Sequence, residues 1–141
     1  EHFELSQQEI AALRSYLENG GFLFAEACCG RKGFDLAFQK MIRTVLPGKE
    51  LQRIPMSSTL FSEPNEVSAV GVTPALMQDL GQARTEPQLM GIDMGGYFGV
   101  IYSPFALAGG WEMSQSPYAR GYNNLGSIKI GQNVLMYAVT N

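Results

Sequence analysis

Residues 20–30 of the chain are Gly20-Gly21-Phe22-Leu23-Phe24-Ala25-Glu26-Ala27-Cys28-Cys29-Gly30. The segment 22–27 is almost entirely apolar and too short for a helix, which is typical of a strand that a parallel sheet covers on both faces. Both cysteines of the chain follow this strand directly. Because ligands bind at the carboxyl ends of parallel strands, the segment predicts where a site would lie.

A helix is expected immediately before this strand. Ser6 and Glu9 have the spacing of a capping box, in which each side chain bonds to the backbone N–H of the other residue. Apolar residues then recur on one helical face at Ile10, Leu13 and Leu17. The helix should end at Asn19-Gly20-Gly21, because glycine adopts the left-handed conformation of a C-terminal cap without strain.

A second helix and a second strand should follow the cysteines. Apolar residues recur at helical spacing at Phe34, Phe38, Met41, Ile42 and Val45, and Pro47-Gly48 ends the pattern. Residues 51–54 have the composition of a short strand. This alternation predicts a three-layer α/β domain, in which helices cover both faces of a mostly parallel sheet.

The remaining chain divides into three parts. Residues 56–89 are interrupted by prolines and polar residues, which predicts an irregular excursion with a short helix near 74–80. Residues 89–93 and 97–102 are expected to form an added hairpin around Met94-Gly95-Gly96. A last helix should begin near Leu125. Its face against the sheet is predicted to comprise Ile128, Gly131, Val134, Leu135 and Ala138, widened by Ile130, Met136 and Tyr137.

Composition limits the function classes. The 141 residues are enough for one domain, spanning 1–141, and 45% of them are hydrophobic. The formal net charge is −3 with scattered Lys and Arg, so a nucleic-acid footprint is absent from the sequence. No apolar run approaches the roughly 20 residues of a membrane helix. The chain begins without Met or a signal peptide, which suggests an internal fragment or a processed form and leaves its localisation open.

Several segments together match the pattern of one known family. They are Leu13-x-x-Tyr16-Leu17-Glu18-Asn19-Gly20-Gly21-Phe22-Leu23, Cys28-Cys29-Gly30, Ile101-Tyr102-Ser103-Pro104, Trp111-Glu112 and Gly131-x-Asn133. In order and spacing they resemble a bacterial domain-of-unknown-function family, number 4159, over nearly the whole chain.

The resemblance implies a fold and no activity. The implied fold is that of class I glutamine amidotransferase-like domains, a flavodoxin-like parallel sheet. It also implies one or more strands before Glu1, so that 1–141 would be the C-terminal part of a longer family domain. Family members are often exported or envelope-associated bacterial proteins, which favours the bacterial envelope or periplasm.

The cysteines are the first candidates for catalysis. Amidotransferases of that fold activate a cysteine with a histidine later in the chain, but no histidine follows Cys29. Because a Cys–His nucleophile needs its base within hydrogen-bond reach, we reject amidotransferase activity. One reduced arrangement remains, in which Cys28 or Cys29 acts with Glu26 or with His2 at the end of a neighbouring strand. The alternative is that the thiols pack as small hydrophobes and that Glu26 anchors an amide or a basic side chain.

A disulfide, a metal or a cofactor is not expected. Adjacent Cα atoms lie about 3.8 Å apart, below the disulfide range of roughly 4.4–6.8 Å, so Cys28 and Cys29 should be thiols. These two residues and His2 provide at most three ligands, whereas a structural zinc site normally has four.

Three further places could hold a ligand. Trp111 and Glu112 follow Gly109-Gly110, so the indole could form a platform beside a hydrogen-bond acceptor; the alternative is that they plug the sheet edge and cap the loop. Gly30 and Arg31 open a helix and could attract an anion, although a solvated basic turn is the favoured explanation. Ser103 ends the second strand of the hairpin.

Two hypotheses follow. The favoured one is a non-catalytic, amidotransferase-like module that binds a partner protein or a small polar ligand at the carboxyl edge of the sheet. The alternative is a cysteine-dependent, hydrolase-like enzyme that uses Cys28 or Cys29. If a strand is missing beside 22–27, we expect self-association or the 56–89 excursion to cover the exposed sheet edge.

Overall fold

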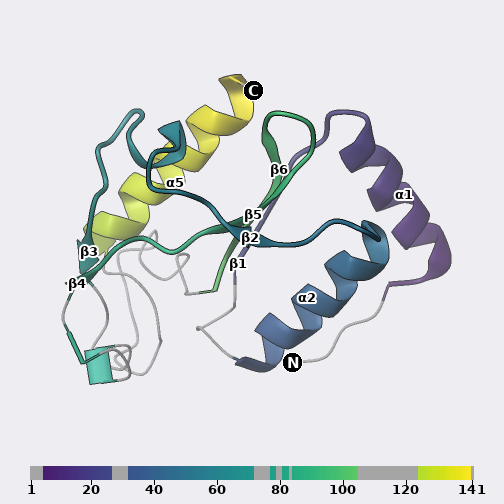
Figure 1. Ribbon diagram of the computed structural model, residues 1–141, viewed down its shortest axis with the longest axis horizontal. Helices are drawn as coiled ribbons and strands as arrows, with labels where there is room; N and C mark the ends of the chain where they lie inside the picture. Colours follow the sequence, from purple (N-terminus) through teal and green to yellow (C-terminus); the bar gives the residue numbers. More distant parts are fainter. Residues whose placement is uncertain are drawn as a thin grey trace.

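The computed structural model describes residues 5–26, 32–71, 77–78, 81–82, 84–104 and 124–140 (Figure 1). Its helices are α1 (Gln7–Glu18), α2 (Lys32–Val45), the short 3₁₀ helix η2 (Thr59–Phe61) and α5 (Asn124–Thr140). Its strands are β1 (Leu23–Glu26), β2 (Gln52–Arg53), β3 (Val70–Gly71), β4 (Arg84–Thr85), β5 (Met90–Asp93) and β6 (Phe98–Ser103). The mixed α/β class is therefore as expected.

The main sheet is mixed, so the prediction of a mostly parallel sheet is wrong. Its strand order is β1-β6-β5-β2, and only β1 and β6 run parallel. β5 and β6 are antiparallel because a tight turn joins them, and β2 pairs antiparallel with β5. β3 and β4 form a separate two-stranded sheet. The parallel direction predicted for 22–27 is thus confirmed for one strand pair.

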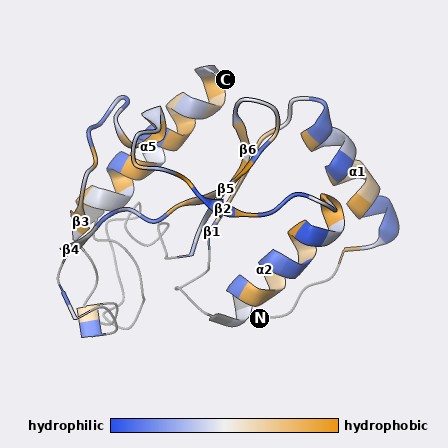
Figure 2. Ribbon diagram, viewed as in Figure 1, coloured by the Kyte–Doolittle hydropathy of each residue, from blue (hydrophilic) through white to orange (hydrophobic). Residues whose placement is uncertain are grey.

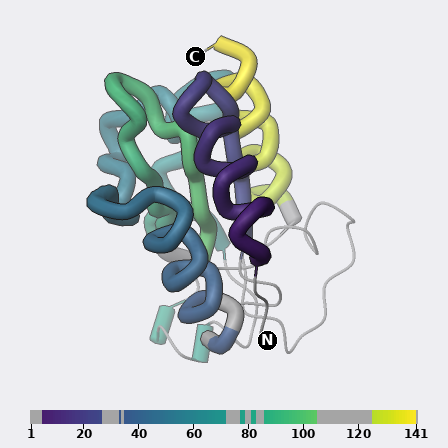
Figure 3. Tube along the Cα trace, turned by 90° about the vertical axis from the view of Figure 1, so that its right-hand side faces the viewer, coloured from purple at the N-terminus to yellow at the C-terminus, as the bar shows by residue number. Residues whose placement is uncertain are grey.

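Helices cover both faces of this sheet, as predicted. Val100 and Tyr102 of β6 pack in one core with residues of α1 and α2, whereas Ile101 packs in a second core with α5. Figure 3 shows α2 and α5 on opposite sides of the strands. Because successive side chains of a strand point to opposite faces, β6 contributes to both cores.

α1 and the turn that follows it form where the sequence predicts them. The Ser6 hydroxyl accepts from the Glu9 N–H at 3.1 Å, and the Glu9 carboxylate accepts from the Ser6 N–H at 2.8 Å. Gly20 follows the helix with φ +93°, a conformation that other residues rarely adopt. Arg14 fixes α1 to the end of α2 by donating to the backbone oxygens of Val45 at 2.6 Å and Thr44 at 3.0 Å.

The β5–β6 hairpin is confirmed, and Asp93 holds its turn. One carboxylate oxygen of Asp93 accepts from the N–H groups of Gly95 and Gly96, each at 2.8 Å. These hydrogen bonds stabilise the ionised form and lower the pKa of Asp93. The turn lies before β6 and therefore at the opposite end of that strand from Ser103.

The face of α5 that meets the sheet differs from the predicted one. Ile130, Val134 and Tyr137 are buried there, whereas Leu135 is 70% exposed and Met136 is 42% exposed. α5 has apolar residues on more than one face, and it carries less blue than α1 and α2 in Figure 2. Periodicity therefore identified the helix and its three buried residues, but it wrongly placed Leu135 and Met136 against the sheet as well.

The described part of the 56–89 excursion packs on α5. Leu60, Phe61, Val67 and Val70 are buried in the same core as Ile130 and Val134. Asn133 of α5 holds this segment with its buried amide. Its nitrogen donates to the backbone oxygens of Leu60 at 2.9 Å and Asn65 at 2.8 Å, and its oxygen accepts from the Asn65 N–H at 3.0 Å. The short helix expected near 74–80 lies largely outside the described residues.

Candidate functional site

The carboxyl ends of β1 and β6 place two polar side chains side by side. Glu26 and Ser103 are direct partners in the parallel register. Two residues earlier, Phe24 and Ile101 face the core that contains α5, so Glu26 and Ser103 project from the same face. Ser103 is 0% exposed and Glu26 is half-buried. A carboxylate thus lies next to a buried hydroxyl where ligands bind in open α/β sheets.

Ser127, a second fully buried serine, lies in the first turn of α5. The Tyr137 hydroxyl accepts from the Phe98 N–H at 2.8 Å, which fixes α5 over the start of β6. We call the register pair Glu26 and Ser103 the strand-end cluster. Figure 1 shows β1 and β6 ending, and α2 beginning, in the lower half of the view, whereas α5 begins beside β3 at the left.

A polar pair occupies the other face of the same strand end. The buried Tyr102 hydroxyl donates to Asp35 Oδ1 at 2.8 Å, and Gln39 donates to Asp35 Oδ2 at 3.0 Å. The Tyr102 ring stacks on Phe38 with centroids 4.4 Å apart. The hydrogen bond between Tyr102 and Asp35 joins the end of β6 to the first turn of α2. Burial, together with the hydrogen bond to Asp35 and the charge of Asp35, raises the pKa of Tyr102 well above its ordinary value of 10.0.

The raised pKa of Tyr102 makes the fold sensitive to alkali. The unfolded chain loses this phenolic proton near pH 10 while the folded chain keeps it, so the contribution of Tyr102 to stability falls as the pH rises above about 10. We expect the free energy of unfolding in urea to decline more steeply above that pH in the parent than in the variant Tyr102→Phe. Equal alkaline slopes for the two proteins would contradict this assignment.

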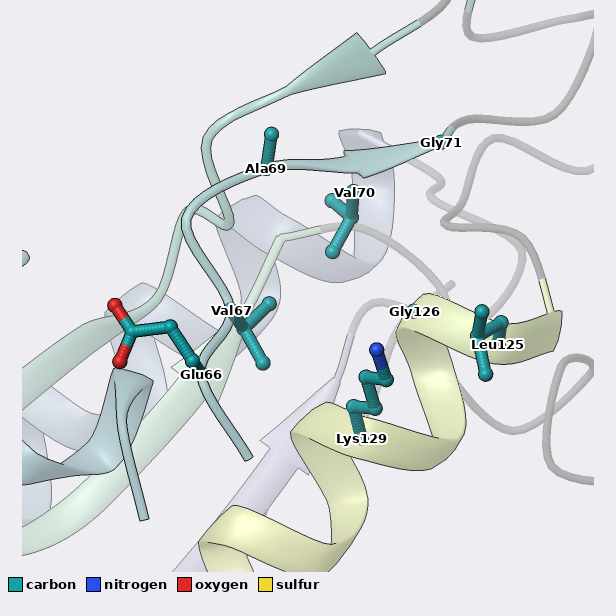
Figure 4. Close-up of a pocket in the computed structure, with 8 residues that line it drawn as sticks. All are labelled: Glu66, Val67, Ala69, Val70, Gly71, Leu125, Gly126 and Lys129. Atoms are coloured by element: carbon teal, nitrogen blue, oxygen red, sulfur yellow. The ribbon is translucent and has the colours of Figure 1, made fainter. Parts of the chain in front are cut away.

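A small cavity of about 70 Å³ lies between β3 and the first turns of α5 (Figure 4). It is lined by Glu66, Val67, Ala69, Val70, Gly71, Leu125, Gly126 and Lys129. In Figure 4 the Lys129 ammonium points into this space, whereas the Glu66 carboxylate points away from it. The volume is enough for a few water molecules or one small group of a larger ligand.

The structure tests only part of the predicted site. It describes Glu26 and Ser103 and brings them together. The other candidates lie outside the described residues, so their roles remain predictions: His2, Cys28, Cys29, Gly30, Arg31, Trp111 and Glu112. Sequence reasoning missed the Tyr102–Asp35 pair, because no local pattern joins residues so far apart in the chain.

The described residues contain neither a candidate metal site nor a candidate membrane-spanning helix. Among the described residues, no group of three or more His, Cys, Asp and Glu side chains could hold a metal ion. Within the same part of the chain, no helix is both long and apolar enough to cross a membrane.

Comparisons with known proteins identify a family. The model of a domain of unknown function, DUF4159, matches residues 1–139. No curated protein and no solved structure matches the chain.

Proposed function

Because the chain belongs to the DUF4159 family, whose description carries no activity, we propose its function from its own geometry: it binds a small polar ligand at the strand-end cluster. The observation that carries this proposal is the register pairing of Glu26 with the fully buried Ser103. The architecture we propose for the module is amidotransferase-like and flavodoxin-like, in which the carboxyl edge of the sheet is the usual binding edge.

The chemistry of the cluster favours a ligand with hydroxyl or amino groups. The half-buried Glu26 carboxylate can only accept hydrogen bonds when ionised, and the fully buried Ser103 lies beside it in the register. Hydrogen bonds that a hydroxyl or ammonium group donates to a carboxylate are stronger than neutral ones. A polyol, a sugar, an amine or an amino acid could supply these donors.

Thermal unfolding in the presence of a panel of such compounds tests the proposal. At least one compound should raise the melting temperature of the parent, since a ligand that binds only the folded state stabilises it. The shift should be lost in Glu26→Gln and reduced in Ser103→Ala. The matched control is Glu18→Gln, which changes an exposed carboxylate at the end of α1, away from the strand end. A shift that persists unchanged in Glu26→Gln would refute the proposed site.

A cysteine-dependent, hydrolase-like activity remains a second candidate, favoured by the half-buried Glu26 two residues before Cys28. It requires a thiol with a lowered pKa, because the thiolate is the nucleophile. The rate of iodoacetamide alkylation against pH, measured in Cys28→Ser and Cys29→Ser, separates the two functions. A low-pH midpoint for one thiol would favour the enzyme, and ordinary slow alkylation of both would exclude it.

A further inference from the structure

α5 carries a second apolar face that does not meet the sheet. Ile128, Gly131, Leu135 and Ala138 follow one another at steps of three, four and three residues, the spacing of a coiled-coil seam. Leu135 is 70% exposed, and Val139 beside it is 78% exposed. We call the four residues from Ile128 to Ala138 the outer seam. A helix that is apolar on several faces is normally covered by other structure.

The outer seam lines a groove. An open cavity of about 410 Å³ lies between α5 and β1, lined by Phe24, Ile128, Gly131, Gln132, Val134 and Leu135. Gln132 is the only polar side chain among these. Gly131, one of the lining residues, has no side chain to fill the groove. The groove could therefore accept an apolar side chain of leucine size from another surface.

We propose that the outer seam pairs with the outer seam of a second copy of the chain, with the two α5 helices antiparallel about a two-fold axis. In that pairing Ile128 of one copy lies opposite Ala138 of the other, and Leu135 lies opposite Gly131. Each large side chain thus meets a small one, as closely packed helices require. Leu135 of each copy enters the groove beside Gly131 and Phe24 of the other.

Charge supports a second copy over a charged partner. Lys129 is the only charged residue in α5, and it lies on the flank that faces β3 rather than on the outer seam. The outer seam carries no charge, so an acidic or basic partner could form no ion pair with it. Two copies of the seam can instead pack their apolar side chains against each other. Antiparallel helices also bring the positive end of each macrodipole near the negative end of the other.

The length of α5 sets the expected stability of the dimer. Its 17 residues span about 25 Å, so two paired helices bury an area at the low end for stable dimers. The dimer should therefore dissociate on dilution. It does not depend on the proposed ligand.

Sedimentation equilibrium between about 1 µM and about 1 mM tests the pairing. The parent should change from monomer to dimer across this range. Leu135→Glu should remain monomeric, with dimerisation weakened by at least about tenfold, because it places a charge in the groove. Met136→Glu is the matched control, with the same charge on the neighbouring residue but outside the seam, and it should dimerise like the parent.

Urea unfolding of both variants at low concentration checks that each remains folded. A parent that stays monomeric over the whole range would overturn the proposal. Equal weakening by the two variants would also overturn it, because the effect would then come from charge on α5 and not from the seam.

Cysteine cross-linking tests the antiparallel orientation. In a Cys28→Ser and Cys29→Ser background, Gly131→Cys and Leu135→Cys are prepared separately and then mixed under oxidising conditions. The mixture should form disulfide-linked dimers faster than either variant alone, because residue 131 of one copy faces residue 135 of the other. Faster cross-linking of each variant with itself would indicate parallel helices and would exclude the proposed pairing.

Discussion

Replacing Asn133 by leucine is expected to lower the free energy of unfolding by about 3 to 4 kcal/mol. Leucine has the same branched shape as asparagine and larger terminal groups, so the substitution opens no cavity and its main cost is the loss of hydrogen bonds. The backbone oxygens of Leu60 and Asn65 and the N–H of Asn65 would lose a partner in a buried or half-buried position. Each buried polar group left unpaired costs about 1 to 3 kcal/mol.

The neighbouring Gln132 supplies the control for this prediction. Its side-chain oxygen accepts from the Asn65 amide at 2.8 Å, but this hydrogen bond is exposed. Water replaces an exposed partner, so Gln132→Ala should change stability by no more than about 0.5 kcal/mol. Urea unfolding of the three proteins makes the comparison. If the two variants lose the same stability, Asn133 is not what holds the excursion on α5.

Replacing Phe38 by alanine should destabilise the fold by about 3 to 5 kcal/mol. Phe38 is 2% exposed in the core between α2 and the sheet, and its ring stacks on Tyr102 at 4.4 Å. Removal of the ring leaves a cavity and also deprives Tyr102 of its packing. The position of the Tyr102 hydroxyl against Asp35 should then become less fixed.

The control for Phe38 lies on the same helix. Leu36 is 61% exposed, so Leu36→Ala removes a similar apolar side chain without opening a cavity. Its unfolding free energy should stay within about 0.5 kcal/mol of the parent. A loss below about 1 kcal/mol in Phe38→Ala would show that the ring contributes little to this core.

Local signals predicted the elements well. The capping box of α1 requires only residues three apart, and the turn after it requires a glycine that tolerates a positive φ. Both are visible in the sequence, and both are confirmed at Ser6 and Gly20. The hairpin followed from two strand-like runs around Gly95-Gly96.

Strand direction and helix rotation depend on distant partners, so the sequence left them open. The alternation of helices and strands indicated parallel strands, but β2 pairs with β5 across the excursion and runs antiparallel to it. On α5 the predicted face includes the buried Ile130, Val134 and Tyr137 but also exposed residues, and only packing against β6 and η2 decides which side is buried.

The candidate site was predictable in position but only partly in composition. The sequence named Glu26 and Ser103 separately, each at the end of a strand, and only the parallel register of β1 and β6 makes them neighbours. The Tyr102–Asp35 hydrogen bond joins residues 67 positions apart, which no local pattern reveals.

The proposed binding at the strand-end cluster is tested most directly by following backbone amide resonances while the panel of polyols, sugars, amines and amino acids is titrated. A compound that binds should shift the resonances of Glu26 and Ser103 and leave the Gly95–Gly96 turn at the other end of β6 unchanged. Shifts confined to that turn, or no shift at the two cluster residues with any compound, would contradict the proposed function.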